Sequence, residues 1–222
     1  MNLAEFNINI IDPFKMCFDK GFYNKTFEEI IKTEINRQHE KSNTNAIGYF
    51  HQNMFKYIKN CEVPKEGWDV IYTGKDHKIY VEMKNKHNTM NSSSAQKTYI
   101  GMANQIMKTK KDYCYLVEVI ATKSQNIAWG ASVNGKHVEN ERIRRVSIDE
   151  FYREVTGVKD AFFQICVQLP ITIEKIVNES DFNISSSNIV IKEIKKINPN
   201  ILAAFYKLAF ETYLGFDKMF DK

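Results

Sequence analysis

One segment constrains the fold of this chain more than any other: residues 113–121 form an almost unbroken apolar run, rich in aromatic and β-branched side chains. A strand that is apolar on both faces has to be covered on both sides, which is typical of central strands in sheets flanked by helices. Its charged residue, Glu118, is expected to meet a basic or backbone partner, because an unpaired buried carboxylate is costly. An extra metal ligand is the alternative role for Glu118.

The remaining segments supply helices and further strands around that centre. Thr26 and Glu29 have the spacing of a capping box, as have Ser147 and Glu150, and each pair predicts the start of a helix. We expect helices over residues 27–40, 46–60, 95–110, 148–157, 160–178 and 201–214, with a polar break at 42–45, a cap at Ser92 or Ser93, and a kink or break at Pro170. We expect further strands over residues 68–73, 78–84 and 127–133, the last followed by a turn at Asn134 and Gly135.

This order of elements predicts an α/β protein with a mixed central sheet flanked by helices. A length of 222 residues suits one domain with an elaborated tail. We expect the domain over residues 1–180, followed over 181–222 by a linker and a C-terminal helix that packs on the same domain.

Several protein classes are disfavoured by composition. The chain has no apolar run long enough to span a bilayer. Residues 1–11 contain Glu5 and no basic residue, so we expect no secretory signal and a cytoplasmic protein of a prokaryote. The four cysteines are far apart and form no C-x-x-C pair. They are expected to be free thiols rather than zinc ligands or disulfides.

The net charge is +4, which permits nucleic-acid binding without requiring it. The distribution is more informative, since basic residues gather at 84–86, 108–111 and 142–145. Each cluster taken alone also fits a solvated surface.

The predicted hairpin over residues 68–84 carries the most informative polar side chains. Side chains alternate between the two faces of a strand. Ile79, Val81 and Met83 therefore share one face of the second strand. Glu82 and Lys84 lie together on the other face, so an acid and an amine stand side by side opposite an apolar surface.

The register of the hairpin decides what those two residues meet. If Thr73 pairs with Lys78 around a four-residue link, Asp69 falls opposite Glu82. Directly opposed side chains point to the same face with Cβ atoms about 5 Å apart. Two carboxylates that close repel each other, and a divalent cation relieves the conflict. Ligation by oxygen alone suits Mg²⁺, and Lys84 lies next to that cation.

Two carboxylates, a cation and a lysine are typical of a phosphodiester hydrolase. The metal binds the scissile phosphate, acidifies the attacking water and neutralises developing charge, while Lys84 orients the water or adds positive charge. The alternative is an ordinary surface ion pair between Asp69 and Lys84. A second acid-x-lysine string, Glu193 to Lys195, lacks a preceding hairpin and is flanked by lysines typical of an exposed surface.

The residues at 67–84 resemble the PD-(D/E)XK nuclease motif, with Asp69 as its aspartate and Glu82-Met83-Lys84 as its E-x-K. Trp68 stands where the motif has proline, a position that varies widely in that superfamily. Residues 47–53 and 81–91 further resemble type II restriction endonucleases that cut at GGNCC, and the similarity runs from about residue 12 to 178.

This resemblance implies a restriction-endonuclease-like core and Mg²⁺-dependent cleavage of double-stranded DNA. It also implies that the backbone carbonyl of Met83 binds the metal, and that an acid on the preceding helix joins the site. Glu34 is the candidate for that acid, and an exposed helix carboxylate is its alternative reading. A palindromic site further implies a homodimer, and a cognate DNA methyltransferase is the genetic partner of a restriction enzyme.

Candidate DNA-contacting residues follow the catalytic strand or lie in the last basic cluster. Amide and hydroxyl side chains read base edges, while lysine and arginine bind guanine or phosphate. A polar loop with a helix cap, or a solvated patch, is the alternative for each. The candidates are Lys86, His87, Asn88, Asn91, Ser92, Gln96, Lys97, Arg142, Arg144 and Arg145.

Three functional hypotheses follow. The first is a type II restriction endonuclease that makes sequence-specific double-strand cuts and leaves 5′-phosphates. The second is a structure-selective repair or recombination nuclease. The third is a DNA-binding module with an inert nuclease fold, which the intact set of Asp69, Glu82 and Lys84 disfavours.

Overall fold

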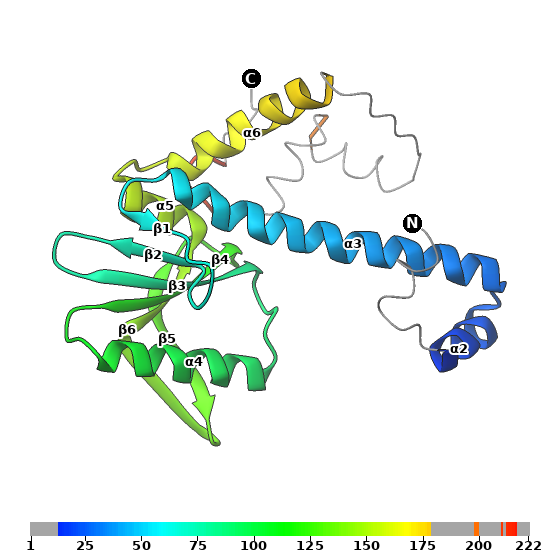
Figure 1. The fold of residues 1–222 in the computed structure, drawn as a ribbon, viewed down its shortest axis with the longest axis horizontal. Helices are drawn as coiled ribbons and strands as arrows, with labels where there is room; N and C mark the ends of the chain where they lie inside the picture. The colour runs from blue at the N-terminus through cyan, green and yellow to red at the C-terminus, as the bar shows by residue number, and fades with distance from the viewer. Residues whose placement is uncertain (1–12, 179–197, 200–209, 211, 217–222) are drawn as a thin grey trace. The chain divides into compact units, whose positions relative to one another are not determined.

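The computed structural model describes residues 13–178, 198–199, 210 and 212–216 (Figure 1). The chain divides into two compact units, residues 1–51 and residues 52–222. The predicted domain boundary near residue 180 stays a prediction, because residues 179–197 lie outside the described part of the chain.

The first unit is helical. It contains α2 (Pro13–Tyr23) and most of α3 (Phe27–Met54). The capping box that opens α3 is confirmed: the Thr26 N–H donates to Glu29 Oε2 at 2.8 Å, and the Glu29 N–H donates to Thr26 Oγ1 at 3.3 Å.

The predicted break at residues 42–45 is wrong, because α3 continues through it to Met54 and is followed by a 3-10 turn (Phe55–Tyr57). Serine, asparagine and threonine lower helix stability by only tenths of a kcal/mol each. With no proline in this segment, nothing forces the helix to end.

The second unit is built on a six-stranded sheet in the order β1-β2-β3-β4-β6-β5. β3 pairs with β4, and β4 with β6, in parallel, while the other neighbours are antiparallel. The sheet is therefore mixed and the predicted α/β fold class is confirmed. The strands are β1 (Cys61–Glu62), β2 (Val70–Thr73), β3 (Lys78–Lys86), β4 (Tyr113–Ile120), β5 (Asn126–Val133) and β6 (Lys136–Ser147).

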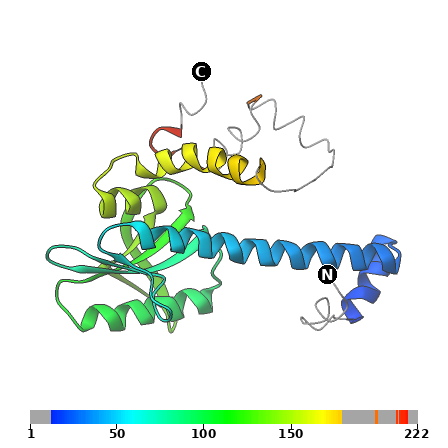
Figure 2. The same ribbon diagram turned by 45° about the horizontal axis from the view of Figure 1, so that its top comes forward.

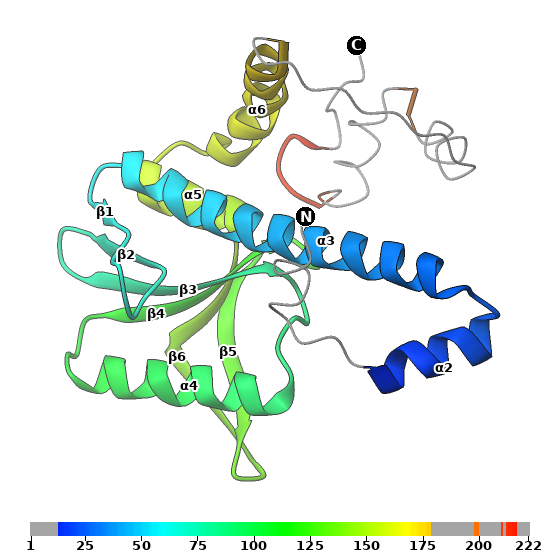
Figure 3. The same cartoon turned by 45° about the vertical axis from the view of Figure 1, so that its right-hand side comes forward.

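The sequence reading missed β1 and β6. β6 carries so many charged residues that its first half reads as loop, and most of that half is exposed. It becomes a strand because the Asn134-Gly135 turn, with φ of 51° and 79°, folds it back onto β5. Figure 3 shows the paired ends of β5 and β6 projecting past α4 (Ser92–Met107).

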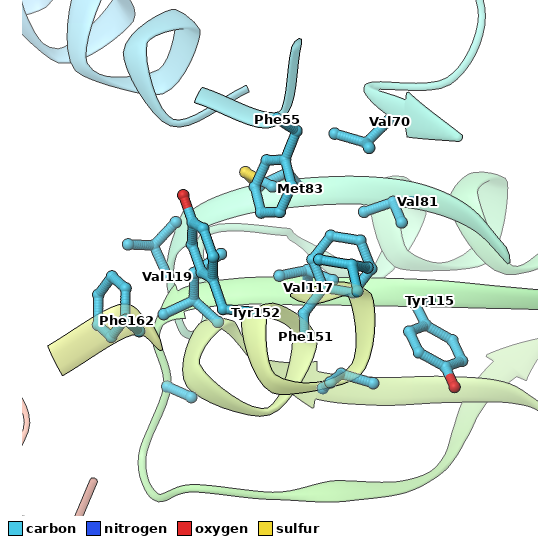
Figure 4. Close-up of a cluster of buried hydrophobic side chains, with 14 of the residues drawn as sticks. Phe55, Val70, Val81, Met83, Tyr115, Val117, Val119, Phe151, Tyr152 and Phe162 are labelled. Carbon is cyan, nitrogen blue, oxygen red and sulfur yellow. The ribbon is translucent and has the colours of Figure 1, made fainter. Parts of the chain in front are cut away.

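Helices cover both faces of this sheet, as the apolar β4 requires (Figure 2). On one face, α4 packs its Tyr99, Met102 and Ile106 against Cys114 and neighbouring apolar residues. On the other face lie α5 (Ile148–Thr156) and α6 (Ala161–Asn178). Their apolar core, shown in Figure 4, includes Phe55, Val70, Val81, Met83, Tyr115, Val117, Val119, Phe151, Tyr152 and Phe162.

Two helix starts differ from prediction. The cap of α4 is Asn91, whose side chain accepts the Ser94 N–H at 2.8 Å, rather than Ser92 or Ser93. Ser147 precedes α5 but makes no side-chain cap, because its hydroxyl accepts the Gln125 N–H at 2.9 Å. The hydroxyl of Ser147 therefore binds a residue distant in the sequence instead of the backbone of its own helix.

The end of the second unit contributes to the core. Pro170 lies inside α6, which continues past it to Asn178. Phe210, Tyr213 and Phe216 are buried in the cluster on the α5 face. Most of the predicted helix over residues 201–214 lies outside the described residues.

Candidate active site

The β2–β3 hairpin has the predicted register, with Thr73 opposite Lys78 and Val70 opposite Val81. Asp69 directly precedes β2, outside the paired residues, and its N–H donates at 3.0 Å to the carbonyl of Val81, the residue already paired with Val70. The predicted pairing of Asp69 with Glu82 is not among the paired residues of the hairpin, but the hairpin brings the Asp69 side chain to the β3 backbone beside Glu82.

Glu82 and Lys84 lie on the face away from the buried Val81 and Met83, as strand alternation predicts. Lys84 Nζ donates to Glu82 Oε1 at 2.7 Å, and the two side chains are 29% and 26% exposed. A pair this accessible can exchange its partners when a ligand arrives.

Asp69 is held more tightly. Its Oδ2 accepts the Met83 N–H at 2.7 Å, which ties the side chain to β3 at the point where β2 begins. Burial raises the pKa of Asp69, the Met83 hydrogen bond partly offsets this, and the negative charge of Glu82 raises the pKa further. The site thus contains two carboxylates in mutual repulsion, which a divalent cation would relieve.

The donor set fits Mg²⁺. In a strand, the N–H and C=O of one residue point toward the same neighbour, so the Met83 carbonyl leaves β3 on the Asp69 side. Two carboxylates and one carbonyl are all hard oxygen donors. The described residues hold no cluster of three or more His, Cys, Asp and Glu suited to a metal. Mg²⁺ commonly uses one or two carboxylates and completes its shell with water and substrate phosphate.

Glu34, the candidate for a further ligand, belongs to the first unit. Its carboxylate accepts Arg37 Nε at 2.7 Å and Gln38 Nε2 at 3.1 Å. The bond to Arg37 is the main cause that lowers the pKa of Glu34 to about 2. A ligand role for Glu34 stays a prediction.

The site lies at the carboxyl ends of the parallel strands. α4 runs back from the end of β3 to the start of β4, so its first turn lies at the same end of the sheet as Lys84. Open α/β sheets bind ligands at this edge. The first turns of α4 and Ser132 of β5 line a cleft of about 490 Å³, whose walls are Ser92, Ser93, Gln96, Lys97, Ile100 and Ser132.

The three arginines of β6 have different partners. Arg142 Nη1 donates to the carbonyls of Ile106 and Thr109 at 3.0 and 2.8 Å, which secures the C-terminal end of α4. Arg144 Nη2 donates to the Asn126 carbonyl at 2.7 Å. Arg145 alone of the three pairs with a buried carboxylate.

That carboxylate is Glu118, and its predicted basic partner is confirmed: Arg145 Nη2 lies 2.6 Å from Glu118 Oε1. His87 Nδ1 lies 3.2 Å from Glu118 Oε2. Sequence reasoning named all three residues but did not connect them, because pairing between parallel strands leaves no short-range sequence signal.

Comparison with known proteins identifies the family of this chain. A family model described as Eco47II restriction endonuclease matches residues 1–178. The chain belongs to the Eco47II restriction endonuclease family. Two curated relatives agree. The type II restriction enzyme Sau96I of Staphylococcus aureus is 33% identical over 182 residues, covering 78% of this chain and 70% of the relative. The type II restriction enzyme Eco47II of Escherichia coli is 31% identical over 185 residues, covering 78% and 76%.

The chain is therefore a site-specific deoxyribonuclease of the restriction type, which confirms the enzyme class of the first functional hypothesis. No solved structure matches the chain. Among the described residues, no helix combines the length and apolar character needed to cross a membrane. The matched region contains the whole β2–β3 hairpin, with Asp69, Glu82 and Lys84.

Proposed function

We propose that this endonuclease cuts both strands of DNA at a GGNCC-type palindrome and uses Asp69, Glu82 and Lys84 as its catalytic set. The observation that carries the proposal is the geometry around the β2–β3 hairpin: the Asp69 carboxylate accepts the N–H of Met83 at 2.7 Å, and Met83 stands between Glu82 and Lys84, whose side chains pair at 2.7 Å. Family membership supports the reaction, and the resemblance of residues 47–53 and 81–91 to GGNCC cutters supports the site.

Asp69, Glu82 and the Met83 carbonyl would hold Mg²⁺. Once bound, the cation would supply positive charge to the scissile phosphate and make its water more acidic. Asp69 is suited to this role because the Met83 N–H fixes its carboxylate, and because the cation removes the repulsion from Glu82.

Lys84 has a role that depends on Glu82. With Glu82 engaged by the cation, the ammonium of Lys84 loses its present partner and is free to donate to the attacking water and to the phosphate. Water adds to phosphorus and the bond to the 3′-oxygen breaks. The products are a 5′-phosphate and a 3′-hydroxyl, which takes up a proton. Lys84 stabilises the negative charge that develops on the phosphate in this step.

The remaining proposals follow from the palindrome. A two-fold symmetric site is matched by two identical subunits, each cutting one strand, so we expect a homodimer. A cognate DNA methyltransferase would protect the host sites, and the prokaryotic cytoplasm is where both proteins would meet DNA.

Digestion of plasmid DNA by the purified protein with Mg²⁺ tests the proposal. We expect discrete fragments whose sequenced ends map to one GGNCC-type palindrome and carry 5′-phosphates. EDTA and the Asp69→Ala, Glu82→Ala and Lys84→Ala variants serve as controls and should leave the plasmid intact. Cutting confined to junctions or flaps would indicate a repair nuclease. Binding of DNA that is unaffected by EDTA, without any cutting, would indicate an inert module.

A further inference from the structure

A buried ionic network lies on the same sheet as the proposed catalytic set. Glu118 of β4 is 1% exposed, and its Oε1 accepts Arg145 Nη2 at 2.6 Å and Nε at 3.0 Å. Its Oε2 lies 3.2 Å from Nδ1 of His87, the residue that follows β3. One buried carboxylate thus holds two basic side chains from two other segments.

The strand register places this network beside Lys84. Lys84 is the parallel partner of Glu118, and Leu116 is the partner of both Glu82 and Arg145. Laterally paired residues share a face and neighbouring strands lie about 4.8 Å apart. One polar group therefore lies toward the carboxyl ends of β3, β4 and β6, on the face whose apolar residues pack against α4. It consists of Glu82, Lys84, Glu118 and Arg145.

The bases of this network are accessible although the acid is not. The side chains of Arg145 and His87 are 23% and 26% exposed, against 2% for Glu118. The bonds to Glu118 use Nε and Nη2 of Arg145, so Nη1 has no partner among the described residues. A planar guanidinium fixed on one edge presents its remaining donors in a set direction, which suits a phosphate.

Stability alone does not account for such a network. Replacing a buried ion pair by apolar residues is often neutral or stabilising, because the desolvation of two charges offsets their attraction. The guanidinium groups of Arg142 and Arg144, in the same strand, donate to backbone and side-chain partners elsewhere. Arg145 is the arginine of this cluster that is anchored to Glu118, the residue paired with Lys84.

We propose that Glu118 is a positioning residue, which holds Arg145 and His87 against a backbone phosphate of the DNA strand beside the scissile bond. Arg145 donates to the phosphate through Nη1, and His87 through its outer ring nitrogen. The proposal rests on the proposed function, because it requires DNA to approach the face that carries Lys84.

The double variant Glu118→Gln/Arg145→Gln tests this, since it removes both charges together and leaves no buried charge unpaired. Affinity for a duplex with the mapped cleavage site is measured at several salt concentrations, in a Lys84→Ala background that leaves the DNA intact. Each phosphate contact contributes about 0.9 to the slope of log K against log salt, so we expect the slope to fall by about 1. With Lys84 present, kcat/KM should fall about tenfold or more.

The matched control is Glu150→Gln/Arg153→Gln. This pair on α5, which packs on the opposite face of the sheet, removes the same two charges. We expect its salt slope and kcat/KM to equal those of the wild type.

A second variant covers the case in which the double variant does not fold. Arg145→Lys keeps a charge next to Glu118 but cannot bridge the carboxylate and a phosphate in the same way. Because the positive charge is kept, we expect an unchanged salt slope. Because the geometry of the guanidinium is lost, we expect a lower kcat/KM. If kcat/KM of Arg145→Lys matches the wild type, or if the folded double variant keeps its salt slope, the inference is overturned. A wild-type protein that cuts no DNA would instead refute the proposed function.

Discussion

Glu82 and Glu118 are two glutamates on one face of the same sheet, each paired with a base, yet their surroundings differ. Glu82 meets Lys84 on its own strand, and both side chains are about a quarter exposed. Glu118 is almost fully buried and meets Arg145 from the neighbouring strand and His87 from beyond β3.

The difference separates two uses of an ion pair. A partly exposed pair between two flexible side chains contributes little to stability, so a ligand exchanges it at low cost. A buried carboxylate with several donors is expensive to disturb and keeps its partners in place. The first arrangement suits groups that must change partners in a reaction, and the second suits groups that must not move.

The largest effect is expected from the exchangeable pair, and it concerns activity. Glu82→Ala and Lys84→Ala should each lower the cleavage rate by on the order of 10²- to 10⁴-fold, because each removes charge that acts on the reacting phosphate. Single-turnover cleavage of a duplex with the mapped site measures this. Circular dichroism should show an unchanged fold, and a variant with normal cleavage would end the assignment of that residue.

The next effect concerns stability and the fixed pair. Arg145→Met leaves Glu118 buried without its main partner, which costs about 3–5 kcal/mol in the free energy of unfolding. Urea denaturation of this variant and of the wild type measures the difference. A loss below about 1 kcal/mol would show that Glu118 is as tolerant as Glu82, and the contrast between the two pairs would fail.

A smaller effect is expected from Asp69, whose pKa is raised by burial and by Glu82. An acid with a raised folded-state pKa destabilises the fold as pH rises past its unfolded-state pKa, about 4. In EDTA at pH 7, Asp69→Asn should therefore have a higher Tm than the wild type, and this gain should disappear below pH 4.

The same variant tests the cation. Mg²⁺ should raise the Tm of the wild type at pH 7, since it binds the folded carboxylates, and should leave the Tm of Asp69→Asn nearly unchanged. Thermal scans with and without Mg²⁺ provide the readout. An equal rise in both proteins would place the cation elsewhere.

The smallest effect is expected on stability, from breaking the partly exposed pair of Glu82 and Lys84. Lys84→Met breaks the Glu82 pair, yet it should change the free energy of unfolding by no more than about 1 kcal/mol, because water can solvate the remaining carboxylate. Urea denaturation without Mg²⁺ checks this. A loss as large as that of Arg145→Met would mean that Lys84 supports the fold rather than the reaction.

Local patterns in the sequence were reliable where neighbours in the chain decide the outcome. Strand alternation placed Glu82 and Lys84 on one face, and the length of the turn set Thr73 opposite Lys78. The same approach failed where a local signal competed with context. The polar residues 42–45 predicted a helix end, but α3 passes through them. Ser147 predicted a cap, but its hydroxyl is taken by Gln125.

The sequence by itself predicted the hairpin that carries the proposed acid–acid–lysine set, because a hairpin folds on neighbouring residues and the side chains of a strand repeat every two residues. Only the tertiary structure decided which base meets Glu118. That choice depends on the parallel register of β3, β4 and β6, strands joined by long crossovers whose alignment no short-range rule specifies. The groups proposed to react could thus be named from one hairpin, whereas the groups proposed to hold the DNA beside them appeared only once three strands were aligned.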